Sequence, residues 1–308
     1  QGRYLRLENI IRHWAPKLFG KYVVEETCVI SATRNADLTF DTEKFEDREE
    51  DFRQLMTKML KKRANQAIVR LELGQKPSQT MMDLLTGMIP VVTGQVYYDS
   101  SPLAMGYVSQ LEKLLPEELR AKLTYVPYQP RWPENLNRQE SMIDQIRRRD
   151  RLLFFPFDSI DPFLKLLEEA ADRPDVASIK ITIYRLASKA KLIEYLAAAA
   201  ENGKDVSVLM ELRARFDEQN NISWAERLED AGCTVQYGFE GVKVHSKICV
   251  IMRTTDNGLQ RITQLGTGNY NEKTSKLYTD FSFMTTDPNI GKDAAEFFKN
   301  MSLENIST

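Results

Sequence analysis

The residues best placed to do chemistry surround one of the two histidines in the sequence. His245 lies between Lys243 and Lys247, in a segment whose alternating apolar residues are typical of a β-strand. The period of two in a strand places these three side chains on one face. Two nearby ammonium groups disfavour imidazolium, so we expect the pKa of His245 to lie below its ordinary value of about 6.5. A neutral imidazole is a nucleophile and the lysines attract anions, although the same row is equally typical of a solvated sheet face.

A glycine-rich segment farther along the chain adds features of a phosphate site. Gly266 and Gly268 allow backbone N–H groups to approach an anion closely, and Asn269 and Asn271 add neutral donors. Alone, a Gly-x-Gly is also typical of an ordinary turn. Its combination with His-x-Lys is more specific and indicates a nucleophilic histidine beside a bound phosphate. The other histidine, His13, lies in an amphipathic helix without a polar cluster, so we interpret it as a packing or surface residue.

Two arginines stand where expected strands end. Arg185 closes one strand, and Arg215 follows another. Ligands of open α/β sheets bind at the carboxyl ends of the strands, and a guanidinium suits bidentate contact with phosphate. The alternative for each arginine is an ion pair with a neighbouring carboxylate such as Glu211, Asp217 or Glu218.

The combination of His245, Lys247 and Asn269 resembles one half of the phospholipase D superfamily motif. In that superfamily the histidine is the nucleophile, and the lysine and asparagine hold the phosphate. The acidic residue that follows the lysine there is missing here, since residues 248–253 contain none. This departure argues against ordinary phosphodiesterase chemistry.

A closer resemblance is to the polyphosphate kinase family. It is carried by segments 154–159, 179–185, 214–222, 241–247 and 265–280, and by 6–12 and 33–37 in the first half. These motifs run in the order of the family, and they cover residues 152–308 almost continuously. The resemblance implies reversible transfer of the terminal phosphate of ATP to inorganic polyphosphate through a phosphohistidine.

The resemblance also implies roles for individual residues. His245 matches the phosphorylated histidine, Tyr278 matches a tyrosine that contacts the nucleotide, and Arg185 and Arg215 match two arginines assigned to a magnesium site. A guanidinium is always cationic. We therefore expect the arginines to bind phosphate oxygens, with Mg²⁺ bridged by phosphate or water. We expect Lys243, Gly266 and Gly268 to contact phosphate, beside the catalytic Lys247 and Asn269.

The expected partners are ATP or ADP and inorganic polyphosphate, with no nucleic acid, and the resemblance implies a homo-oligomer. Two other functions stay open from the residues: a phospholipase D-like phosphodiesterase or nuclease, and a non-catalytic module that binds polyanions. The family also has an N-terminal helical domain and a second catalytic domain with another histidine, for which this sequence has no counterpart. With no initial Met, the chain is expected to be a piece of a longer one.

Composition limits the class of protein. The 308 residues suggest about two domains. The net charge of −2 gives no overall attraction to nucleic acid or membranes. Three cysteines without a CxxC pair favour a reducing, cytoplasmic setting, and the chain has no apolar run of the ~20 residues that span a membrane. Peripheral association with a membrane is compatible with these features.

The elements that must position the site follow from hydrophobic periodicity. A proline-rich segment, 125–133, favours a boundary between a head domain over 1–130 and a catalytic domain over 131–308. In the first we expect helices at 5–19, 42–64, 78–88 and 107–123, the last broken at Pro116, and a strand at 67–73. In the second, strands are expected at 152–156, 179–183, 206–212, 234–237, 242–252, 261–265 and 278–285. Helices between them predict an α/β fold: an α+β head, then a mixed, largely parallel sheet covered on both faces.

Overall fold

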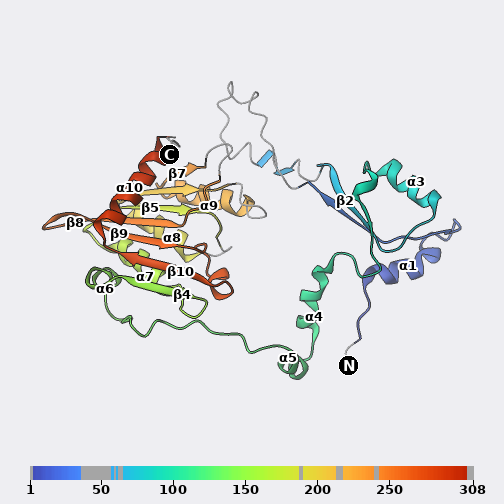
Figure 1. Cartoon of the computed structure of the whole chain (residues 1–308), viewed down its shortest axis with the longest axis horizontal. Coiled ribbons are helices and arrows are strands. Elements are labelled where there is room, and N and C mark those ends of the chain that lie inside the picture. The colour runs from blue at the N-terminus through green and yellow to red at the C-terminus, as the bar shows by residue number, and fades with distance from the viewer. Residues whose placement is uncertain are drawn as a thin grey trace. The chain divides into compact units, whose positions relative to one another are not determined.

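The computed structural model describes residues 3–35, 57–58, 60–61, 65–186, 190–212, 218–238 and 243–303, without the side chain of Glu218. The described chain divides into two compact units, and the division falls between Val126 and Pro127, within the proline-rich segment (Figure 1). The long charged helix expected over 42–64 lies almost entirely outside the described residues.

The first unit contains a three-stranded sheet in the order β1-β2-β3. Strands β1 and β2 are antiparallel, and β2 and β3 are parallel. Helix α3 begins after Ser78, whose hydroxyl accepts a hydrogen bond from the N–H of Met81 at 3.2 Å, as expected for an N-cap. Pro116 separates α4 from α5, as predicted. The bounds are α1 Leu7–Leu18, β1 Ile30–Arg34, β2 Ile68–Leu73, α3 Gln79–Met88, β3 Val96–Tyr98, α4 Val108–Leu114 and α5 Glu117–Leu123.

The second unit is built on a seven-stranded sheet in the order β4-β10-β9-β8-β5-β6-β7 (Figure 1). Its strands are β4 Arg151–Phe155, β5 Val176–Ile183, β6 Asp205–Met210, β7 Thr234–Tyr237, β8 Ile248–Thr255, β9 Gly258–Gly266 and β10 Asp280–Thr285. Its helices are α6 Met142–Arg148, α7 Asp161–Asp172, α8 Lys191–Glu201, α9 Glu218–Asp230 and α10 Pro288–Ser302. The prediction of an α/β fold is confirmed.

The prediction that the sheet is largely parallel is wrong. Only β5–β6 and β6–β7 are parallel among the neighbouring strands of this sheet, and the other pairs are antiparallel. Parallel neighbours need a crossover, which α8 and α9 supply for β5, β6 and β7. By contrast, β8 and β9 form a hairpin that closes at Gly258, whose φ of 98° favours glycine. The sheet is therefore mixed and mostly antiparallel.

Helices bury both kinds of strand. Helices α7, α8 and α9 pack on one another and on β5, β6 and β7, while α10 packs on β8 and β9. Phe298 and Ala294 of α10 form a buried cluster with Leu209, Val244 and Val250. Val244 thus anchors the segment before β8 to the core, one residue from His245.

The strand expected over 242–252 begins later than predicted. Strand β8 starts at Ile248, and residues 243–247 have no regular secondary structure. The apolar alternation is real, but the backbone of this segment bonds mainly to side chains of β5 and of the residue after β6, and among the described residues it meets a neighbouring strand only where Lys247 accepts from Gly266 at the end of β9. Its side chains therefore do not alternate strictly between two faces.

Candidate functional site

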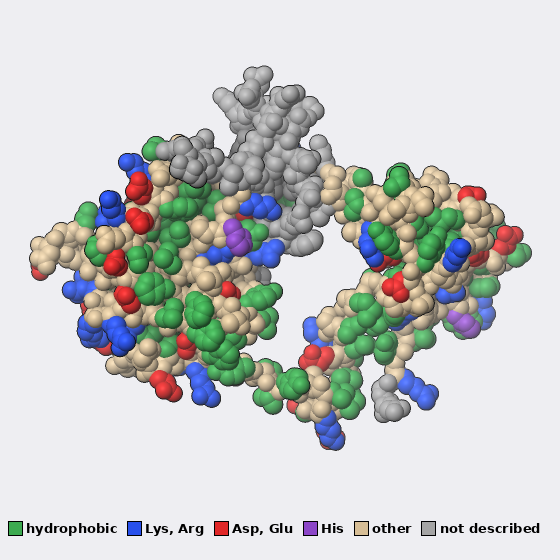
Figure 2. Space-filling model, in the orientation of Figure 1, with side chains coloured by type: hydrophobic (Ala, Val, Ile, Leu, Met, Phe, Trp, Pro, Cys, Tyr) green, Lys and Arg blue, Asp and Glu red, His purple; other side chains and the backbone are tan. Residues whose placement is uncertain are grey.

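The imidazole of His245 is exposed and lies against an aromatic ring. Its centroid is 4.7 Å from that of Tyr184, and the two rings are nearly perpendicular at 79°. Tyr184 follows the last residue of β5, so the ring stands at the carboxyl end of a parallel strand. Figure 2 shows a histidine on the surface of the second unit with Lys and Arg side chains on either side. Two segments far apart in the sequence thus form one site.

The pKa of His245 is lowered, in the predicted direction. Partial burial is the largest cause, followed by the positive charges of Lys247 and Arg185. The sequence had suggested Lys243 and Lys247 as the responsible pair. Arg185 from the end of β5 takes the place of Lys243, whose side chain is exposed. The consequence is the one expected: the imidazole is neutral near pH 7 and has a lone pair available.

Lys247 is placed differently from the prediction. Its side chain is only 6% exposed, whereas His245 is exposed, so the two do not share one open face. The Nζ atom of Lys247 nevertheless donates a hydrogen bond to the backbone oxygen of His245 and lies 5.2 Å from the ring centroid of Tyr184. Burial lowers the pKa of Lys247, and the Asp280 carboxylate opposes that shift. The ammonium therefore stays beside the histidine, supported by a nearby negative charge.

Arg185 completes the group of cations. The centre of its guanidinium lies 5.6 Å from the Tyr184 ring centroid. Tyr184 therefore has the imidazole, the ammonium of Lys247 and the guanidinium of Arg185 around one ring. A π-face tolerates cations at this distance, which helps to keep two like charges close together.

The glycine-rich loop closes against Lys247. The N–H of Gly266 donates to the backbone oxygen of Lys247 at 2.9 Å. Gly268 has no space for a side chain, because a Cβ there would lie 2.3 Å from Oδ2 of Asp280. Oδ1 of Asp280 in turn accepts from the hydroxyl of Thr267 at 2.8 Å. The structure gives Gly268 a steric role: it admits the carboxylate that lies near Lys247.

The two asparagines of this loop differ in their hydrogen bonds. Oδ1 of Asn271 accepts from the N–H groups of Lys273 and Thr274 at 3.0 and 3.1 Å, so this residue shapes a turn. Oδ1 of Asn269 is buried and has no hydrogen-bond partner within the described residues. A buried polar atom without a partner is unusual and often marks a functional position. Asn269 is therefore the asparagine with capacity for a ligand.

The other predicted residues are exposed or lie outside the described residues. Tyr278 is 62% exposed and lies two residues before β10. Lys243 is exposed, and Arg215 lies outside the described residues. The sequence patterns assign no role to Tyr184 or Asp280, and they suggest Glu211 only as an ion-pair partner of an arginine. The only signals for them were a polar residue at the edge of an apolar strand and a carboxylate at a strand end.

A divalent metal would find few protein ligands here. No group of three or more His, Cys, Asp or Glu side chains within the described ranges is arranged to hold a metal ion. The donors beside His245 are mostly cationic, so a metal would need oxygens from a bound phosphate. This fits the expectation that Arg185 contacts phosphate and not the metal itself. Among the same residues, no helix is long and apolar enough to cross a membrane.

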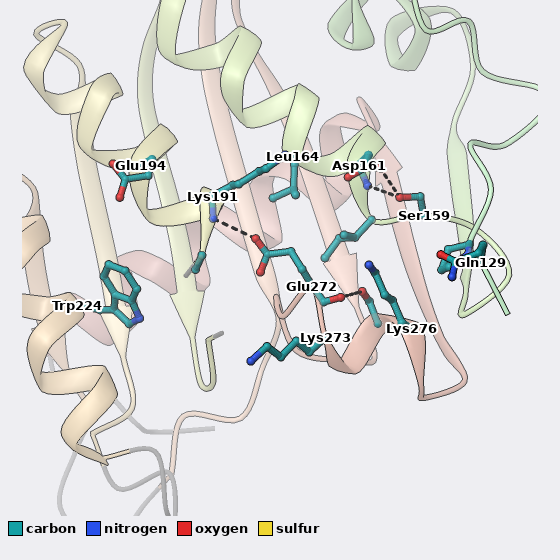
Figure 3. A pocket seen from close by; sticks show the side chains of 14 residues that line it. Gln129, Ser159, Asp161, Leu164, Lys191, Glu194, Trp224, Glu272, Lys273 and Lys276 are labelled. Carbon is teal, nitrogen blue, oxygen red and sulfur yellow. Dashed lines mark hydrogen bonds between the residues drawn. The ribbon is translucent and has the colours of Figure 1, made fainter. Parts of the chain in front are cut away.

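A separate pocket of about 720 Å³ lies between the N-terminal ends of α7 and α8 and residues 272–276 (Figure 3). Lys191, Lys273 and Lys276 line it together with Asp161, Glu194 and Glu272. Oε1 of Glu272 accepts a hydrogen bond from the N–H of Lys191, the first residue of α8, at 3.0 Å. The pocket is thus lined by equal numbers of lysines and carboxylates, and His245 does not line it.

Known proteins match this chain over nearly its whole length. The family model for the polyphosphate kinase middle domain matches residues 1–111, and that for polyphosphate kinase C-terminal domain 1 matches residues 141–306. The polyphosphate kinase of Bacillus cereus is 40% identical over 301 residues, covering 97% of this chain and 42% of the relative. That of Staphylococcus epidermidis is 39% identical over 297 residues, covering 96% and 40%.

A solved structure also matches this chain. The crystal structure of polyphosphate kinase from Porphyromonas gingivalis matches with a TM-score of 0.74 and 28% identity, over 98% of this chain and 42% of that chain. This chain thus spans about 42% of the length of the relatives named first. On the family model that covers more than half of it and on these relatives, the chain belongs to the polyphosphate kinase family.

Proposed function

We propose that this chain carries the nucleophile for reversible transfer of the γ-phosphate of ATP to inorganic polyphosphate. His245 is the residue that takes the phosphoryl group. The observation that carries the proposal is its imidazole, whose pKa is lowered by burial and by Lys247 and Arg185, in a chain of the polyphosphate kinase family. Such a ring is both neutral and surrounded by charges that attract phosphate.

The transfer runs in two balanced steps. A ring nitrogen of His245 forms a bond to the γ-phosphorus while the bond from that phosphorus to the bridging oxygen breaks, and ADP leaves. A terminal oxygen of polyphosphate then attacks the phosphohistidine, which restores the histidine and lengthens the polymer by one unit. In both steps Lys247, Arg185 and Asn269 stabilise negative charge on the transferring group, as phosphoryl transfer requires.

The remaining site residues have supporting roles in the proposal. Tyr278 contacts the nucleotide, and Lys243 draws the polyanion toward the exposed imidazole. Gly266 holds the loop beside Lys247, and Gly268 makes space for Asp280. Arg215 joins Arg185 in binding phosphate oxygens. Mg²⁺, when bound to the nucleotide phosphates next to these arginines, supplies charge neutralisation without ligands from a protein cage.

The proposal extends to organisation and setting. Residues 1–130 act as the head domain and 131–308 as the first catalytic domain. The whole protein assembles as a homo-oligomer and works in the cytoplasm. The named relatives are longer than this chain, so the complete activity belongs to the full-length protein.

Labelling with ATP tests the proposal. We expect full-length protein with γ-labelled ATP and Mg²⁺ to gain a label that is labile to acid and stable to base. The label should be absent from His245→Ala. His13→Ala is the matched control, because His13 lies in the first unit with its ring edge-on to Trp14, 5.1 Å away, and it should label normally. Wild-type protein that stays unlabelled while it cleaves a phosphodiester would support the phosphodiesterase alternative instead.

A further inference from the structure

Three polar side chains are buried where β5 and β6 approach the His245 segment. Thr182 and Glu211 are each 1% exposed, and Asn221 is 0% exposed. Burying a carboxylate or an amide costs free energy unless it forms good hydrogen bonds. Each of the three forms hydrogen bonds with the backbone of residues in or next to the site.

Glu211 fixes the residue before His245. Its Oε2 accepts a hydrogen bond from the N–H of Val244 at 2.8 Å. The side chain of Val244 is buried with Leu209 and Val250, so Val244 is held through both its backbone and its side chain. The backbone next to His245, from which the exposed imidazole projects, is therefore held in place.

Thr182 fixes the residues after His245. Its hydroxyl donates to the backbone oxygen of Ser246 at 2.8 Å and accepts from the N–H of Ile248 at 3.0 Å. These two groups lie on either side of Lys247. A single side chain of β5 therefore sets the course of the backbone through the lysine that flanks the histidine.

Asn221 ties the two anchoring strands together. Its Nδ2 donates to the backbone oxygens of Glu211 and Tyr184, both at 2.9 Å. The N–H of Glu211 also donates to the oxygen of Ile183 at 2.9 Å. The backbones of Tyr184 and Glu211, at the ends of the two strands, are thus tied to the same side chain.

We infer that Thr182 and Glu211 are positioning residues for the nucleophile, holding residues 244–248 so that the imidazole of His245 stays beside Tyr184, Lys247 and Arg185. Neither touches the transferred phosphate. The inference rests on the proposed function for its kinetic consequence, but the hydrogen bonds stand independently of it. It differs from a purely structural role because the groups held are those next to the reacting atom.

Four variants of the full-length protein test this inference. Thr182→Val removes both hydroxyl bonds at nearly constant volume, and Glu211→Met removes the acceptor for Val244. Glu211→Gln keeps a side-chain oxygen that can accept from Val244, so it serves as the conservative rescue. Thr263→Val is the matched control: its hydroxyl is 0% exposed on β9 and has no hydrogen-bond partner within the described residues.

The first measurement does not depend on kinase activity. Hydrogen exchange of the Val244 amide should become faster in Glu211→Met, and that of the Ile248 amide in Thr182→Val. Neither should change in Thr263→Val. Unchanged exchange in the first two variants would overturn the inference. If Glu211→Met does not fold, Thr182→Val and Glu211→Gln still decide the question.

The second measurement is the single-turnover rate of histidine labelling from ATP. We expect the rate to fall about 10-fold in Thr182→Val and about 10²-fold in Glu211→Met, since small displacements of a reacting group have effects of this order. The KM for ATP should stay the same, and Glu211→Gln should recover most of the rate. Normal labelling despite faster exchange would overturn the inference. Wild-type protein without label would instead overturn the proposed function, and the exchange data would then decide on the positioning role alone.

Discussion

Two regions of the second unit offer a charged ligand very different surroundings. The pocket between α7 and α8 has a volume of about 720 Å³ and is lined by three lysines and three carboxylates. His245 does not line it, and the charged groups that shift the pKa of its imidazole are both cations. By volume the pocket is a strong candidate for a site, and by charge it is the weaker of the two.

Under the proposed function, phosphoryl transfer takes place where the charged groups acting on the histidine are cations, and not in the pocket where charges of both signs are present. A transferring phosphoryl group gathers negative charge that preorganised donors must meet. The pocket has as many carboxylates as lysines among the residues that line it. Beside His245, the carboxylate of Asp280 acts on Lys247 and accepts a hydrogen bond from Thr267.

The largest effect on transfer is expected from Lys247→Met, compared with Lys273→Met in the pocket. Loss of one donor to the transferring group typically slows a reaction about 10²–10³-fold. We expect a loss of this size in the labelling rate for Lys247→Met and no change for Lys273→Met. Equal losses in the two variants would show that the pocket takes part in the chemistry and would remove the contrast.

The next effect concerns the two glycines near Lys247. In Gly268→Ala the new methyl group collides with the carboxylate of Asp280, whereas in Gly266→Ala the nearest atom, at 3.1 Å, is the end of the Gln264 side chain. Overpacking of this kind costs about 1–3 kcal/mol. We expect Gly268→Ala to lower both the stability and the labelling rate, and Gly266→Ala to do so less. Urea unfolding and labelling would measure this, and the reverse order would contradict the steric role of Gly268.

A smaller effect on the labelling rate is expected from a change of pH. Because the pKa of His245 lies below its ordinary value, the neutral, nucleophilic form persists as the pH falls through about 6.5. The labelling rate at subsaturating ATP, which reports the free protein, should therefore fall to half of its maximum only below that pH. A pH–rate profile between pH 5 and 8 measures this. A half-maximal rate above pH 6.5 would show that the surrounding cations do not act on the imidazole.

No effect on the labelling rate is expected when an ion pair elsewhere on the same sheet is removed. Asp175 accepts hydrogen bonds from Arg173 and Arg253, both at 2.8 Å, and these arginines lower the pKa of Asp175 to about 2. Asp175→Asn should lower stability by about 1.5–3 kcal/mol, the usual contribution of hydrogen bonds to charged groups. The folded-state pKa is depressed, so this stability is complete above the ordinary pKa of about 4 and is lost as the pH falls toward 2. A slower labelling rate in this variant would mean that lower stability alone impairs the site.

Local patterns in the sequence predicted most elements of the second unit but not how they pair. Val176–Ile183 and Asp205–Met210 were found from their apolar runs, and Gly203 and Gly232 end α8 and α9 with positive φ, as expected. The prediction of parallel pairing is wrong for β8, β9 and β10. Strands joined by a hairpin and strands joined by a crossover have similar apolar patterns in the sequence. Pairing depends on contacts between distant segments, which local periodicity does not contain.

The site was predicted to a similar extent. Spacing, together with the resemblance it carries, singles out His245, Lys247 and Asn269 as candidates. The alternating valines around His245 predict a strand, while hydrogen bonds with the side chains of Thr182 and Glu211 hold the segment in another conformation. Tyr184 and Asp280 reach the site from distant parts of the chain, and neither belongs to the His-x-Lys or Gly-x-Gly-Asn pattern. The residues of a short motif can be found in the sequence, whereas the distant residues that hold them in place cannot.

The cations beside His245 have a consequence for the moment when substrate arrives. A bound polyanion cancels part of the charge of Lys247 and Arg185, and its own negative charge favours imidazolium, so substrate binding raises the pKa of His245. A histidine that began at its ordinary pKa would then be protonated to a larger extent in that complex. Because His245 begins below that value, the shift caused by the substrate is partly offset in advance, which under the proposed function favours the neutral ring that attacks the phosphorus.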